Sequence, residues 1–167
     1  MSDSHRQTDT ESVGGAGWAA PPTAKDRAAV QRAVDRLLDD LAPERAATHV
    51  ERPPAAIERH RTPRGCILQA ATGAVSVSWF PDSANEAALG ELQVVAWQGH
   101  VSRPGSAHRT GGATVARELV LRPIEKGAAG LEWEAADGTR YDTDALAAYC
   151  RALLEDRMRE TGAAPTA

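Results

Sequence analysis

Apolar and polar residues alternate most clearly between residues 130 and 141. Leu131, Trp133 and Ala135 alternate there with two glutamates. Side chains on a β-strand point alternately to opposite faces, so this pattern predicts a strand with one apolar and one acidic face. Asp137-Gly138 then predicts a turn, and a short second strand follows.

Two registers are open to this hairpin. A two-residue loop would pair Glu134 with Tyr141 and leave the tyrosine on the wet face. A three-residue loop, 136–138, would put a glycine in the left-handed position of a bulge. It would pair Trp133 with Tyr141 on the apolar face and Glu134 with Arg140 on the wet face. We favour the three-residue loop because both pairs are then favourable.

Two segments have the three- and four-residue spacing of amphipathic helices. The first follows Thr23, which together with Asp26 resembles a capping box, and ends near Leu41. The second begins after Asp142 or Thr143, either of which can cap the first turn. Its apolar stripe comprises Leu146, Tyr149, Cys150, Leu153 and Leu154, and Gly162 is a suitable stop.

The chain between these helices has mainly strand character. We expect strands at 66–70, 74–80, 91–101 and 115–124. The proline-rich segment 43–64 is interpreted as a wrapping connection that could hold one or two helical turns. Consecutive strands with short links favour a meander. The predicted class is therefore α+β, with an antiparallel meander sheet of about five or six strands packed against an N-terminal and a C-terminal helix.

Length and composition define the expected domain. The 167 residues suffice for one core. Residues 1–22 lack periodicity and are predicted to be a disordered tail, 23–162 a single domain, and 163–167 a frayed end. A net charge of −4 argues against nucleic-acid binding. No apolar run approaches ~20 residues and no signal peptide is evident, so we expect a cytoplasmic protein without membrane contact.

The loop 102–114 is the strongest candidate for a binding site. No Asp or Glu occurs between Leu92 and Arg117, and the loop is rich in glycine. Arg103, His108 and Arg109 make it locally basic, and glycine-rich loops with nearby arginine can hold an anion. Contact with an anion or an acidic partner is therefore a hypothesis for these three residues, although the loop lacks a phosphate-binding signature.

Catalytic, cofactor and metal motifs are missing from the sequence. The spacing of His49, His60 and Cys66 matches no zinc pattern. Cys66 and Cys150 both lie in apolar segments, which favours two reduced, buried thiols. Glu132 and Glu134 share a wet strand face, which is typical of solubilising residues. We assign no catalytic residue, cofactor or metal.

One further feature is Trp18, a large aromatic in the predicted tail that could anchor another protein or equally fold back onto its own domain. The sequence therefore favours a small non-enzymatic protein-binding or adaptor module with a protein partner. A homodimer is also compatible with a sheet covered on only one face. One alternative is an anionic small-ligand binder or enzyme with a pocket near loop 102–114. Another is a chaperone or immunity-type partner of a larger protein, which would use a sheet or helix face.

Overall fold

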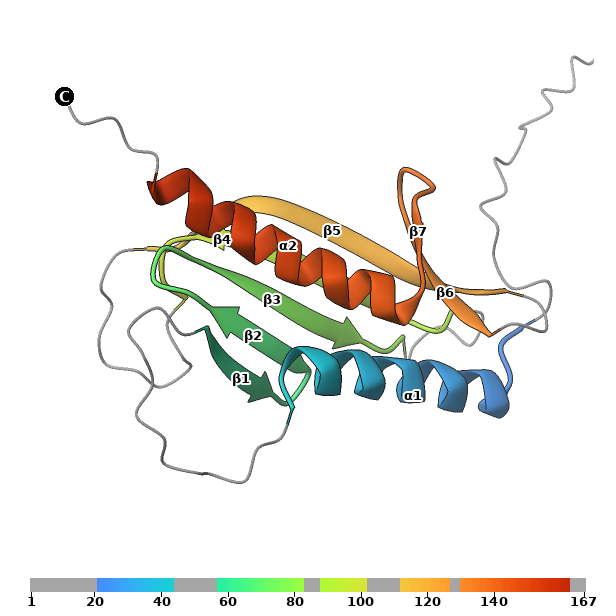
Figure 1. The fold of residues 1–167 in the computed structure, drawn as a ribbon. Coiled ribbons are helices and arrows are strands. Elements are labelled where there is room, and N and C mark those ends of the chain that lie inside the picture. Colours follow the sequence, from blue (N-terminus) through green and yellow to red (C-terminus); the bar gives the residue numbers. More distant parts are fainter. Residues whose placement is uncertain (1–20, 44–56, 83–87, 102–111, 127–129, 163–167) are drawn as a thin grey trace, which may run out of the picture.

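The computed structural model describes residues 21–43, 57–82, 88–101, 112–126 and 130–162. Within these ranges the chain forms two helices and one seven-stranded sheet (Figure 1). The elements are α1 (Ala24–Leu41), β1 (Glu58–Thr62), β2 (Gly65–Gln69), β3 (Gly73–Phe80), β4 (Glu91–Gln98), β5 (Thr114–Glu125), β6 (Leu131–Ala135), β7 (Arg140–Tyr141) and α2 (Thr143–Gly162). Strand order follows chain order and every pair is antiparallel, which confirms the predicted α+β meander.

Both helices begin where the sequence predicts a cap. At α1 the Thr23 hydroxyl accepts a hydrogen bond from the Asp26 N–H (3.3 Å), and the Asp26 carboxylate accepts one from the Thr23 N–H (2.7 Å). At α2 the Asp142 carboxylate accepts from the Ala145 N–H (2.7 Å), so Asp142 rather than Thr143 is the cap. Each interaction pairs amide groups that a helix start leaves without a partner.

The β6–β7 hairpin has the three-residue loop that the sequence favours. Trp133 pairs with Tyr141 and Glu134 with Arg140. Gly138 has a φ of +82°, the left-handed conformation that a G1 bulge requires. The hairpin leads directly into α2, which places the first turn of this helix beside β6 and β7.

One prediction was wrong. Part of the segment interpreted as a wrapping connection, Glu58–Thr62, is the edge strand β1, paired with β2 from Glu58↔Gln69 to Thr62↔Gly65. Its sequence ERHRT has no apolar alternation, because an edge strand pairs through its backbone and often carries charged side chains. Residues 44–56 of that segment lie outside the described ranges.

Both helices pack on one face of the sheet, and the core lies between the helices and this face. α2 contacts β3 and β4, while α1 contacts β2 and α2 (Figure 1). The core face of the sheet alternates as predicted: Val75, Val77, Leu92, Val94 and Leu121 point toward the helices and are buried. Two large aromatic residues, Trp79 and Trp133, fill the space that these smaller residues leave.

Candidate functional site

The residues to which the sequence assigns a possible binding role lie outside the described ranges. Trp18 precedes residue 21, and Arg103, His108 and Arg109 fall between Val101 and Gly112. The anion-binding and docking hypotheses for them therefore stay predictions. The site discussed below consists of described residues only.

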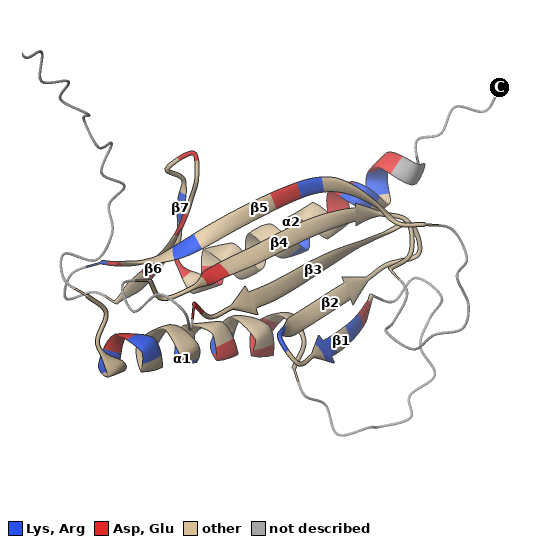
Figure 2. Ribbon diagram, turned by 180° about the vertical axis from the view of Figure 1, so that it is seen from behind, with Lys and Arg blue, Asp and Glu red and all other residues tan. Residues whose placement is uncertain are grey.

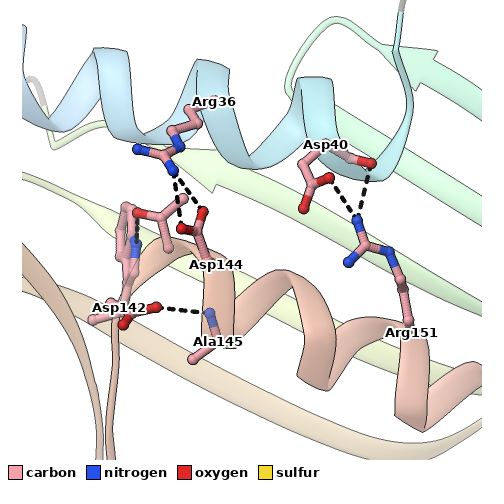
Figure 3. A network of polar contacts seen from close by, with 8 residues as sticks. Arg36, Asp40, Asp142, Asp144, Ala145 and Arg151 are labelled. Atoms are coloured by element: carbon pink, nitrogen blue, oxygen red, sulfur yellow. Dashed lines mark hydrogen bonds and ion pairs between the residues drawn. The ribbon is translucent and has the colours of Figure 1, made fainter.

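The polar network between the helices is a structural feature rather than a reactive site (Figure 3). Arg36 on α1 donates to both carboxylate oxygens of Asp144 on α2 (2.8 and 2.9 Å). Arg151 on α2 contacts the side chain of Asp40 (2.7 Å) and its backbone carbonyl (3.2 Å). The two pairs follow the same order along both helices, so α1 and α2 run in the same general direction. They are exposed, and each contributes about 0–1 kcal/mol.

Two grooves lie on the helix side of the molecule. One, of about 540 Å³, lies between α1, the β1–β2 turn and the end of β3. The other, of about 390 Å³, lies beside the start of α2. The cations of the larger groove already have partners, since Arg61 pairs with Asp39 and Arg64 lies 5.5 Å from the centre of the Phe80 ring. Across the described ranges, no group of three or more His, Cys, Asp or Glu residues is placed to hold a metal ion.

Both cysteines belong to the core and are free thiols. Burial raises the pKa of the Cys66 thiol to about 12, and burial likewise raises that of Cys150 to about 12. A thiol must ionise to act as a nucleophile. Arg61 lowers the pKa of Cys66 by less than burial raises it, so this arginine does not activate the thiol. The buried, free state of both cysteines confirms the prediction of buried thiols.

The sheet face opposite the helices, here called the open face, is the most distinctive surface. Seen from behind, α2 lies beyond the strands β3–β5 (Figure 2). Small residues line this face on β2 and β3: Gly65 and Ala74, which are buried, and Ser76 and Ser78, which are half-buried. Larger apolar side chains surround them, half-buried at Ile67 and Trp97, and exposed at Phe80 (39%), Val115 (55%) and Val120 (37%). Trp97 donates from its indole nitrogen to the Ser76 hydroxyl (2.9 Å), which fixes its ring across the face.

Charged residues gather at one end of the open face, where they pair with one another. Arg122 on β5 contacts Glu91 on β4 (2.7 Å), and Arg140 on β7 contacts Glu134 on β6 (2.9 Å). The latter is the cross-strand pair predicted from the hairpin. Lys126 and Glu132 form a third pair (2.5 Å), and this hydrogen bond raises the pKa of Lys126. The glutamates of β6 therefore have structural partners.

A second feature adjoins the open face. β5 pairs with β4 from Thr114 to Leu121, but with β6 only from Leu121 to Glu125. In the part of the chain that the structure describes, no strand pairs with the other side of Thr114–Val120, here called the free edge. Figure 1 shows β5 running along the margin of the sheet beyond the β6–β7 hairpin, which bends away from it.

The helix side of the free edge carries an arginine and two tyrosines. The Arg117 guanidinium lies 5.8 Å from the centre of the Tyr149 ring, and that ring lies 5.3 Å from the ring of Tyr141. Burial of the Tyr149 hydroxyl raises its pKa, and this hydroxyl has no hydrogen-bond partner within the described ranges. Arg117 is exposed and forms no ion pair with a described carboxylate. Its charge does reach Asp137 in the β6–β7 loop, because the pKa of Asp137 is lowered first by hydrogen bonds to Thr139 and to a lesser degree by Arg117.

Sequence reasoning placed a strand at 115–124 but assigned no role to its residues. The missing information was the length of the neighbouring strand: β5 spans 12 residues and β6 only 5. Two exposed valines and two charges within TVARELV are a signal that could have drawn attention to this segment.

Comparisons with protein-family models, with curated proteins and with solved structures found no match to this chain. Of the helices that the structure describes, neither is both long and apolar enough to cross a membrane.

Proposed function

We propose that this protein is a small, non-enzymatic protein-binding module that contacts its partner through the open face. One observation carries the proposal: Phe80, Val115 and Val120 are large apolar side chains that stay exposed on one face of the sheet. Exposed apolar side chains on one sheet face, with polar residues around them, are a feature of protein-contact surfaces. Gln93 and Glu118 lie among the three on this face. Here the border is the row of paired charges led by Arg122 and Glu91.

The chemistry of the face suits a protein partner better than a small ligand. Small ligands favour concave sites that bury most of their surface. The open face instead offers aromatic and β-branched side chains spread over four strands, with Trp97 held in place by Ser76. Ordered aromatic residues of this kind often provide much of the energy of a protein interface. This mode of contact fits the chaperone or immunity-type alternative as well as a simple adaptor.

A charge placed in the middle of the open face tests the proposal. Ser78 is half-buried on β3 between Gly65 and Gln93, so Ser78→Arg projects a long cation into the surface. The matched control is Ala152→Arg on the exposed side of α2. The tagged full chain, both variants and a chain lacking residues 1–22 are used to capture proteins from the native cell extract, followed by mass spectrometry.

We expect a stoichiometric partner that binds the wild-type chain and Ala152→Arg but not Ser78→Arg. Loss of that partner on removal of residues 1–22 alone would instead assign the contact to the Trp18 tail. Equal capture by Ser78→Arg and wild type, or no partner at all, would contradict an open-face contact. Circular dichroism establishes beforehand that both arginine variants are folded.

A further inference from the structure

We infer that the free edge of β5 receives an extended segment of another protein, which adds to the sheet as a further strand beside the β6–β7 hairpin. This inference rests on the proposed function and names the mode of contact. The Lys126 N–H donates to the Gly130 carbonyl across the β5–β6 connection (2.9 Å). The N–H and C=O of one residue point to the same side of a strand, and this side alternates from residue to residue. From Arg117 to Lys126, where β5 has no bulge, the even-numbered residues therefore point their N–H and C=O toward the β6 side.

Glu118 is the residue of this series that lies clear of the hairpin. The last β5–β6 pair is Leu121↔Ala135, and Glu118 lies three residues before it. Its N–H and C=O therefore point out from the free edge, while Arg117 and Leu119 pair with Ala96 and Val94 on β4. An extended peptide satisfies such groups by adding a strand, and its alternate side chains supply specificity.

A second copy of this chain does not suit the free edge. A two-fold antiparallel pair centred on Arg117 would set Arg117 opposite itself, and one centred on Glu118 would oppose two glutamates. Like charges directly opposite each other destabilise a strand pair. A pair centred on Leu119 would require Leu121 to face Arg117, but that side of Leu121 already pairs with Ala135. A pair centred on Ala116 would oppose no like charges, but it would fall where the β4–β5 register shifts and the alternation of backbone groups is interrupted. The charges and this bulge together disfavour self-association through the free edge.

The side chains beside the free edge define the partner segment. Arg117 has an exposed guanidinium with no described ion-pair partner, so an acidic residue opposite it would be favoured. Leu119 lies on the same face and is half-buried, which favours an apolar residue opposite. In an antiparallel strand the residue opposite Leu119 comes two positions before the one opposite Arg117. The expected pattern is therefore apolar, any residue, acidic.

A proline substitution tests the edge directly. Glu118→Pro removes the outward N–H and leaves the bonds to β4 in place, because proline is tolerated in edge strands where its nitrogen faces outward. Glu118→Ala is the matched control, since it removes the same side chain and keeps the N–H. A phage-displayed library of random ten-residue peptides is selected on the full chain. Fluorescence anisotropy then gives the affinity of enriched synthetic peptides for each folded variant.

Enriched peptides should carry the apolar-x-acidic pattern, bind wild type and Glu118→Ala alike, and bind Glu118→Pro at least about tenfold more weakly. Arg117→Glu should weaken acidic peptides by a similar factor and favour peptides with lysine at that position. Weaker binding to Glu118→Pro tests the backbone contact, and the changed peptide preference of Arg117→Glu tests the charge contact. Either result would support strand addition even if the other variant loses stability.

Several outcomes would overturn the inference. These are failure to enrich any peptide, equal binding to Glu118→Pro and wild type, or binding only after residues 1–22 are removed, which would show that the chain's own tail occupies the edge. The proposed function is tested separately, because Ser78→Arg does not touch the free edge. A partner lost with Ser78→Arg but retained with Glu118→Pro would uphold the open-face contact and reject strand addition.

Discussion

The indole rings of Trp79 and Trp133 meet edge to face in the core, with centroids 6.0 Å apart and planes at 76°. Trp79 lies on β3 and Trp133 on β6, so β4 and β5 run between their strands. Three strand spacings amount to roughly 14 Å, and only large side chains can bridge that distance. With few aromatic residues in the chain, this pair connects the two halves of the sheet beneath the helices.

Replacement of Trp133 by alanine should lower the free energy of unfolding by about 3–5 kcal/mol, because this fully buried ring leaves a cavity and an unpaired Trp79. The matched control is Thr143→Ala, which removes only the long 3.4 Å hydrogen bond to the Trp133 indole. We expect the control to cost less than about 1 kcal/mol. Urea unfolding measures both; a small loss for Trp133→Ala would contradict a central role for the pair.

Two neighbouring aspartates at the start of α2 should differ in their contributions to stability. Asp142→Ala removes the cap acceptor for the Ala145 N–H and should cost about 1 kcal/mol. Asp144→Ala removes an exposed ion pair with Arg36 and should cost only about 0–1 kcal/mol. Thermal unfolding compares the two, and a larger loss for Asp144 would mean that the interhelical pair matters more than the cap.

Gly65 should tolerate no side chain. A Cβ at this position would lie 1.8 Å from the Val77 carbonyl oxygen, so the β2–β3 pair would have to separate. We expect Gly65→Ala to destabilise the fold by roughly 1–3 kcal/mol or more. Gly112→Ala is the control, because nothing lies within 4 Å of its Cβ position. Similar melting temperatures for the two variants would disprove this close strand approach.

The two buried thiols should be unreactive in the folded protein. Because burial raises the pKa of Cys66 and of Cys150 to about 12, little thiolate exists at pH 8. A disulfide reagent such as dithionitrobenzoate should therefore modify both cysteines rapidly in denaturant and very slowly in buffer. Rapid modification of the native protein would show that at least one thiol is accessible.

The same thiols should make the fold sensitive to alkali. Their pKa is raised on folding above the usual value of 9.0, so their stabilising contribution is complete below pH 9. It is lost as the pH rises from 9 toward 12, because only the unfolded thiols ionise there, at roughly 1.4 kcal/mol per pH unit for each thiol. Cys66→Ala and Cys150→Ala should flatten this slope in urea unfolding at pH 8–10.5; an unchanged slope would assign it to other groups.

The amino-acid sequence by itself determined the features that depend on near neighbours. Each helix start depends on a hydrogen bond between residues three positions apart, Thr23 with Asp26 and Asp142 with Ala145. The local sequence therefore reveals both helix starts. The bulged β6–β7 loop likewise follows from one glycine and two favourable cross-strand pairs. Such signals sufficed to predict the α+β meander, because short links leave consecutive strands little choice but to pair.

Tertiary structure decided the features that no side-chain pattern along the chain reveals. β1 is a strand because β2 offers it a backbone edge, and no apolar pattern in ERHRT reveals that. The free edge exists because β6 ends after Ala135 while β5 continues along β4 to Thr114. The backbone groups that stay unpaired depend on the relative lengths of two neighbouring strands. The side-chain pattern along one strand does not reveal those lengths.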